Sequence, residues 1–350
     1  MTRRRALVGH GIAVFALAAA CGGDDGGRTS SNSGPPLDSI GSASNSGANT
    51  GGVETEGPMT GGATTGADDT MGASGDDDTK FDLPPAGDVS LDDGCAAVDF
   101  MFVIDNSISM QDQQNALKAA FPEFITTIQT TLPTTDYHIM VVDTDAEGRC
   151  APGTCSHSTC QEAGQYACDN IFDACDTTRG AGVVHPAGQG ASNMQCNLQG
   201  GNRYIVEGQP DLETTFDCVA SVGLAGHPSE RPIDGMVEAV SAPLNSPGAC
   251  NEGFLRDDGI LVVTFISDDP NVEDTNSAQQ AYDALVAAKN GNAEAVVVLG
   301  LIPGNQPHWS DFISMFGGRG IEGPVTDGDY NQFFLDAVAI IEDTCLDFEG

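Results

Sequence analysis

The sequence predicts an α/β fold in which helices flank a doubly wound, mostly parallel sheet. Short apolar runs alternate with helix-length amphipathic segments from residue 95 to the end of the chain. Strands that alternate with helices in this way typically form βαβ units, and the strands of such units are parallel. The apolar runs are also continuous, which is typical of strands that helices cover on both faces. The length of this region is that of one large domain with a sizeable core.

The expected elements follow one another along the chain. Strands are expected at 100–104, 136–142, 203–206 (an edge strand), 260–266, 293–302 and 321–325. Helices are expected at 111–132, 211–222, 231–240, 276–290, 308–316 and 330–343. The first helix is identified by apolar residues at near-helical spacing, which are Leu117, Phe121, Phe124, Ile125 and Ile128.

A carboxylate and two hydroxyls follow the first expected strand. Asp105, Ser107 and Ser109 form a D-x-S-x-S pattern between the apolar run 100–104 and the helix that begins at residue 111. Side chains at alternate positions of one loop can point at a common centre, and ligands of open α/β sheets bind at the carboxyl ends of strands. All three are hard oxygen donors, which suit Mg²⁺, Mn²⁺ or Ca²⁺ rather than zinc or copper. The alternative is a loop that only caps the following helix.

In this setting the segment 105–109, DNSIS, resembles the metal-ion-dependent adhesion site of von Willebrand factor A domains, and the resemblance covers roughly residues 95–345. It implies two further loops with ligands, usually a threonine and then an aspartate. Asp268 matches the later aspartate, since it ends the apolar run 259–267, and Asp269 is the reserve; the alternative for both is an acidic turn before a helix. No threonine stands near Leu224, where the resemblance would place it. Ser229 could supply a hydroxyl there, or could simply cap the next helix.

A second acidic loop lies at residues 143–148, DTDAEG. It resembles the opening of a calcium-binding loop, but Thr154 occupies the twelfth position, where such loops carry glutamate. We therefore interpret it as a solvated turn, with a second calcium site as the alternative.

Residues 1–20 have the organisation of a signal peptide. A basic region with Arg3, Arg4 and Arg5 precedes the apolar stretch 11–20, which is too short to span a bilayer. The small residues before Cys21 resemble a bacterial lipobox, in which the cysteine becomes the lipidated first residue; the usual leucine three places earlier is Ala18 here. An ordinary secretory signal with an A-x-A cleavage site and a twin-arginine signal are the alternatives.

Residues 21–94 are expected to be the lipidated cysteine followed by a disordered tether. The segment is rich in Gly, Ser, Thr, Asn and Asp and nearly free of aromatic residues. Such a composition cannot bury enough apolar surface to offset chain entropy. A flexible chain of this length reaches roughly 45–50 Å on average, which would hold the domain away from a membrane. We expect an exported protein that is lipid-anchored at the bacterial cell envelope, on the outer membrane or the cell surface.

The cysteine count also favours export. Ten cysteines remain after Cys21, an even number typical of a disulfide framework, and we expect five disulfides among Cys95, Cys150, Cys155, Cys160, Cys168, Cys175, Cys196, Cys218, Cys250 and Cys345. Cys95 and Cys345 bracket the domain and are a plausible pair. Seven of the cysteines lie between residues 150 and 218, which indicates a Cys-rich insertion at about 148–202. We expect disulfides within the insertion to stabilise it. The alternative is a zinc cluster of Cys150, Cys155, His157 and Cys160, although this spacing is poor for a zinc finger.

Charge and missing motifs narrow the function. The formal charge is −38, and cleavage before Cys21 would remove three arginines and no acidic residue. So strong a negative charge excludes nucleic acid as a partner. It would also repel anionic lipid headgroups, so we expect membrane contact through the lipid anchor alone. No H-E-x-x-H, Walker A or G-x-S-x-G motif is present, and we expect no enzymatic activity. The resemblance implies divalent-metal-dependent protein binding or adhesion, with an acidic side chain of the partner on the ion. The alternatives are a scaffold whose metal site has decayed and an unrecognised metal-dependent hydrolase.

Overall fold

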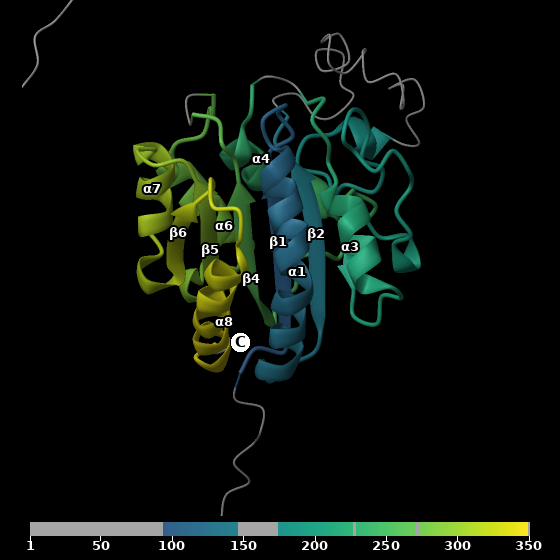
Figure 1. Cartoon of the computed structure of the whole chain (residues 1–350). Coiled ribbons are helices and arrows are strands. Elements are labelled where there is room, and N and C mark those ends of the chain that lie inside the picture. The colour runs from purple at the N-terminus through teal and green to yellow at the C-terminus, as the bar shows by residue number, and fades with distance from the viewer. Residues whose placement is uncertain (1–93, 146–173, 227–228, 271–272, 349–350) are drawn as a thin grey trace, which may run out of the picture. The chain divides into compact units, whose positions relative to one another are not determined.

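A computed structural model describes residues 94–145, 174–226, 229–270 and 273–348 of the chain. Within them, six strands form one sheet in the order β3-β2-β1-β4-β5-β6, in which only β3 runs antiparallel to its neighbour (Figure 1). The strands are β1 Ala97–Ile104, β2 Tyr137–Asp143, β3 Ile205–Val206, β4 Gly259–Ile266, β5 Val296–Ile302 and β6 Gly320–Pro324. The α-helices are α1 Gln111–Thr131, α3 Leu212–Ala220, α4 Pro232–Ala239, α5 Ala242–Asn245, α6 Ala278–Ala288, α7 Pro307–Ser314 and α8 Asn331–Leu346.

Helices cover both faces of the sheet because alternate residues of the buried strands point to opposite sides. On one face Phe100 and Phe102 of β1 pack with residues of α1, α3 and α8. On the other face Met101 and Val103 pack with residues of α4, α6 and α7. Every residue of β1 and β4 is buried, as expected for central strands. The predicted fold class, a doubly wound and mostly parallel sheet between helices, is confirmed.

The observed elements agree with the expected ones to within a few residues, and the main differences are at β1, β3 and β5. β1 begins at Ala97 and therefore includes Asp99, a fully buried carboxylate inside an otherwise apolar strand. Its Oδ1 accepts a 2.7 Å hydrogen bond from Nε of Arg256, which lies 157 residues away in sequence. The edge strand β3 is only two residues long, and residues 293–295 form a turn of 3₁₀-helix ahead of β5 rather than part of the strand.

Three disulfides lie within the described residues. Cys95–Cys345 joins the segment just before β1 to α8, the last helix. The pairing agrees with the expectation from their positions at the two ends of the domain. Cys196–Cys218 ties the segment before β3 to α3. Cys175–Cys250 is not local, because it reaches the connection between α5 and β4. The remaining cysteines of the five-disulfide prediction and of the zinc alternative, Cys150, Cys155, Cys160 and Cys168, lie outside the described residues together with His157.

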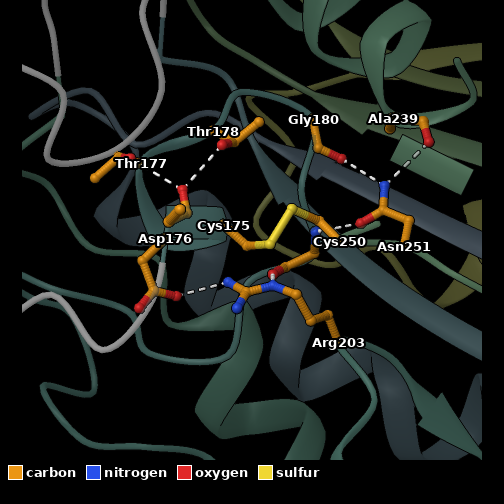
Figure 2. Close-up of a disulfide and its surroundings, with 11 residues drawn as sticks. Cys175, Asp176, Thr177, Thr178, Gly180, Arg203, Ala239, Cys250 and Asn251 are labelled. Carbon is orange, nitrogen blue, oxygen red and sulfur yellow. Dashed lines mark hydrogen bonds and ion pairs between the residues drawn. A yellow bond between two sulfur atoms is a disulfide. The ribbon is translucent and has the colours of Figure 1, made fainter. Parts of the chain in front are cut away.

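A polar network surrounds the Cys175–Cys250 disulfide (Figure 2). The Arg203 guanidinium donates a 2.6 Å hydrogen bond to Asp176, which follows Cys175. The side-chain amide of Asn251 donates to the carbonyls of Gly180 and Ala239 at 2.8 and 3.0 Å. The segment that follows Cys175 is thereby fixed to the end of α4.

The two ends of this domain lie at the amino edge of the sheet. The backbone amide of Cys95 donates a 2.7 Å hydrogen bond to the carbonyl of Cys345, beside their disulfide. The described chain therefore enters and leaves the domain at the edge opposite to the carboxyl ends of β1 and β4 (Figure 1). Among the described residues, no helix is both long and apolar enough to cross a membrane. The expected signal peptide, Cys21 and the tether fall in residues 1–93, outside the described part.

Candidate metal centre

The candidate site lies at the carboxyl ends of the three central strands. The register pairs Ile104 of β1 with Asp143 of β2 and with Ile266 of β4. The residues that follow these three positions therefore meet at one edge of the sheet. This edge is where open α/β sheets bind their ligands.

A chain of hydrogen bonds joins the four residues that the sequence predicted as ligands. The backbone amide of Ser107 donates to Oδ1 of Asp105 at 2.7 Å. The hydroxyls of Ser107 and Ser109 are 3.2 Å apart. The Ser109 hydroxyl in turn donates to Oδ1 of Asp268 at 2.8 Å. The structure thus brings the loop after β1 and the loop after β4 into direct contact through these side chains.

A second contact between the same loops runs through Ser267, which the sequence analysis did not single out. Its hydroxyl donates a 2.6 Å hydrogen bond to Oδ2 of Asp105. Asp269, the reserve candidate, is half-buried and donates its backbone amide to the Ser267 hydroxyl at 3.3 Å. Asp268 is therefore the residue whose carboxylate reaches the serine loop, and Asp269 supports it through the backbone.

The Asp105 carboxyl is fully buried, and its environment disfavours the charged form. Burial raises the pKa of Asp105 to about 7, against the hydrogen bonds from Ser267 and Ser107, which lower it, while the charge of Asp269 raises it further. A buried carboxylate whose neighbours are negative is the type of group that a bound cation would stabilise.

Gln114 of α1 positions the loop after β1 against the middle loop. Its amide nitrogen donates to the carbonyls of Asp105 and Gly223 at 3.0 and 2.8 Å, and its amide oxygen accepts from the Gly223 amide at 3.3 Å. The amide of Gly226 also donates to the Asn106 carbonyl at 3.1 Å. A Cβ at Gly226 would stand 2.0 Å from Oδ1 of Asn106, so this close approach requires glycine.

The middle loop does not bring Ser229 into this hydrogen-bond chain. The Ser229 hydroxyl donates to Oε2 of Glu273 at 3.0 Å, at the rim of the site. Leu224, near the position where the resemblance would place threonine, is buried and donates its backbone amide to the Gln189 carbonyl at 2.6 Å. Glu230, which follows Ser229 in the sequence, has a buried side chain.

Glu230 is a buried carboxyl that the sequence analysis missed. Its side chain is 1% exposed, and its Oε2 accepts a hydrogen bond from the hydroxyl of Thr144. Burial raises its pKa well above the ordinary value, and the charges of Asp105 and Asp145 raise it further. No sequence motif marks this residue, because its importance depends on the strand that lies beside it.

The same contact corrects our interpretation of the acidic loop at 143–148. Asp143, Thr144 and Asp145 are at most 5% exposed and therefore do not form a solvated turn. Asp145 pairs with Glu230 in an isolated antiparallel bridge, and its Oδ2 accepts a 3.4 Å hydrogen bond from the Asn106 amide. The loop is buried because the segment before α4 covers it. Residues 146–148 lie outside the described part of the chain.

Carboxylates alone do not form a metal site here. In the described ranges, no group of three or more His, Cys, Asp or Glu residues has an arrangement that could hold a metal ion. Any cation at this edge would therefore depend on the hydroxyls of Ser107 and Ser109 as well as on the carboxylates. Such a mixed set of hard oxygen donors fits Mg²⁺, Mn²⁺ or Ca²⁺.

Comparisons with known proteins do not identify a family for this chain. No family model matches the chain, and no curated protein matches it. Among solved structures, it is similar to proximal thread matrix protein 1 from the mussel byssus, with a TM-score of 0.38 and 11% identity over 71% of this chain. The match spans 49% of that protein, and a likeness of this degree carries no argument about function.

Proposed function

We propose that this domain is a binding head that holds one divalent cation, Mg²⁺, Mn²⁺ or Ca²⁺, and binds a protein partner through it. The ligands in this proposal are Asp105, Ser107, Ser109 and Asp268. The observation that carries it is the hydrogen-bond chain through these four residues, which come from two loops at the carboxyl ends of neighbouring parallel strands. The resemblance of residues 105–109 to a metal-ion-dependent adhesion site supports the same conclusion.

The exposure of the serine loop supports binding to a large partner. Asp105 is fully buried, whereas Ser109 is exposed and the Ile108 side chain between the two serines is 64% exposed. A cation on this loop would therefore have protein ligands on its inner side and solvent on its outer side. Divalent cations keep exchangeable waters at such open positions, and an acidic side chain of a partner can replace one. Ile108 would add an apolar contact beside the ion.

The arrangement of the domain also suits a tethered receptor. The described chain enters at the edge of the sheet opposite to the serine loop. A tether at residues 21–94 would therefore join the domain on the side opposite to this loop. Export, lipidation at Cys21 and anchoring at the cell envelope belong to the same proposal. The disulfides support export, since such bonds persist in oxidising compartments.

Calorimetry tests the metal site directly. The chain from residue 21, with Cys21 replaced by serine to prevent lipidation, would be titrated with Mg²⁺, Mn²⁺ and Ca²⁺. We expect saturable binding of one ion by this protein and none by Asp105→Ala. Asp311→Ala, which removes an exposed acid on α7, is the matched control and should bind like the parent. Absence of binding by the parent for all three ions would refute the proposal.

Capture of envelope proteins tests the partner. Immobilised protein would be incubated with envelope extract in the presence of the binding ion or of EDTA. A partner that binds through the ion should be lost with EDTA and with Asp105→Ala. Equal capture under all conditions would show that the site is not the binding surface, and the scaffold alternative would replace the proposal.

A further inference from the structure

We infer that Glu230 is a direct ligand of the cation in the candidate metal centre and supplies the donor that the middle loop otherwise lacks. This inference rests on the proposed function, because it adds a ligand to the same site. It assigns a role to a residue that neither the D-x-S-x-S pattern nor the resemblance indicated.

The backbone holds Glu230 beside the carboxyl end of β2, next to the loop that carries Asp105. The backbone amide of Arg231 donates a 2.8 Å hydrogen bond to the carbonyl of Thr144, and Glu230 forms a bridge with Asp145. Since β2 and β1 are neighbours in register, this places Glu230 one strand away from Asp105.

One oxygen of Glu230 remains available to a ligand. Its Oε2 accepts from the Thr144 hydroxyl, but its Oε1 is buried and has no hydrogen-bond partner among the described residues. The buried Oδ1 of Asn106, whose side chain bonds to Asp145, also lacks a partner within this part of the chain. Buried polar atoms are nearly always satisfied in native proteins, so an unsatisfied carboxylate oxygen indicates a missing partner.

The charges around Glu230 indicate that this partner is a cation. Its bridge partner Asp145 is a buried carboxylate, and so is Asp105 at the end of the neighbouring strand. No lysine, arginine or histidine of the described ranges forms an ion pair with Asp105, Glu230 or Asp268. Buried charges in proteins are paired or coordinate metals, and a divalent ion would balance the two buried carboxylates of Asp105 and Glu230.

The resulting donor set differs from one built on a threonine. A threonine hydroxyl contributes only a dipole, whereas Glu230 contributes a full negative charge, and ligand charge is a main determinant of divalent-ion affinity. Asp105 and Glu230 would hold the ion from the inner side, and Ser107 and Ser109 would complete the protein ligands. Asp268, which accepts a hydrogen bond from Ser109, would remain the ligand from the loop after β4.

Glu230→Gln separates this role from a purely structural one. Glutamine has the size of a protonated glutamate, and its amide oxygen can still accept from Thr144. The variant should therefore keep the melting temperature of the parent in EDTA. We expect its affinity for the ion to fall at least about tenfold in calorimetry, because a charged ligand is lost. Glu273→Gln is the matched control, an exposed acid at the rim of the site, and should change the affinity less than about threefold because its charge is screened by solvent.

The possible results are distinguishable. If the parent binds an ion, Asp105→Ala does not, and Glu230→Gln binds like Glu273→Gln, then Glu230 is a structural carboxyl and only this inference fails. If the parent binds no ion, the proposed function fails as well. If Glu230→Gln proves unstable in EDTA, Glu230→Asp provides the second test, because it keeps the charge but shortens the side chain by one methylene group. A loss of ion affinity of at least about tenfold in Glu230→Asp, with the melting temperature of the parent in EDTA, supports direct ligation, and an affinity equal to that of Glu273→Gln refutes it.

Discussion

The hydroxyl of Ser109 donates a 2.8 Å hydrogen bond to Asp268, although 159 residues separate the two in sequence. Ser109 belongs to the loop after β1 and Asp268 to the loop after β4, so this bond links two neighbouring loops at their exposed tips. The bond from Ser267 to Asp105 links the same loops at their buried bases. Hydrogen bonds therefore join the two loops both at the protein surface and in the interior.

The first prediction concerns this exposed link. Ser109→Ala removes one proposed ligand and the contact with Asp268, and we expect ion affinity to fall about tenfold or more. The free energy of unfolding in EDTA should change by no more than about 0.5 kcal/mol, because the side chain is exposed. Ser310→Ala is the control, since that serine makes a comparable 2.7 Å bond to Glu322 far from the site. Calorimetry and urea denaturation measure both quantities, and unchanged ion affinity in Ser109→Ala would contradict the prediction.

The second prediction concerns a conflict between stability and binding at Asp105. Asparagine would keep an oxygen for the Ser107 amide and could donate to the Ser267 hydroxyl, while removing a buried charge. In EDTA at pH 8, we expect Asp105→Asn to raise the free energy of unfolding by about 1–3 kcal/mol. The same change should abolish the stabilisation that the ion gives to the parent protein. If Asp105→Asn is less stable than the parent in EDTA, the surroundings do not destabilise the ionised form of Asp105.

The third prediction concerns Asp99, at the other edge of the sheet. Burial raises the pKa of Asp99 to about 6, although the charge and hydrogen bonds of Arg256 lower it. The folded state thus holds this proton more tightly than the unfolded state does. The resulting stabilisation is complete below about pH 4 and is lost as the pH rises through 6. Urea denaturation between pH 4 and 7 should show a fall in wild-type stability that exceeds the fall in Asp99→Asn by up to about 3 kcal/mol. Parallel curves for the two proteins would contradict this assignment.

The fourth prediction concerns the disulfide between Cys95 and Cys345. It closes a loop of 250 residues, and replacing both cysteines with alanine should lower the free energy of unfolding by about 2–5 kcal/mol. Ion affinity should remain that of the parent, because the bond lies at the edge of the sheet opposite to the site. Replacing Cys196 and Cys218 instead, which close a loop of 22 residues, gives a comparison with a smaller expected loss. A tenfold change in ion affinity in the first variant would show that the two edges are coupled.

The sequence predicted those features that depend on local patterns. The apolar run before Asp105 and the helical spacing after Ser109 identify β1, α1 and the loop between them, because these signals lie within a few neighbouring residues. Asp268 could be found for the same reason, since it lies two residues after the last residue of β4.

Other features could not be predicted because they depend on contacts between distant segments. Glu230 is significant only because Thr144 and Asp105 lie beside it, and Ser267 only because its hydroxyl reaches Asp105. Asp99 interrupts an apolar strand, and no local pattern indicates that Arg256 will pair with it. The disulfide Cys175–Cys250 likewise connects segments whose proximity is set by the sheet order.

The placement of the chain entry and the serine loop at opposite ends of β1 has a mechanical consequence. A partner held at residues 105–109 and a tether attached before Cys95 would pull on the two ends of the same strand. β1 is paired along its length with β2 on one side and β4 on the other. A force along this strand therefore loads both ladders in shear, so that their hydrogen bonds must break together instead of one after another. The Cys95–Cys345 disulfide would pass part of this load to α8, so the domain would resist tension applied between a tether before Cys95 and a partner at residues 105–109.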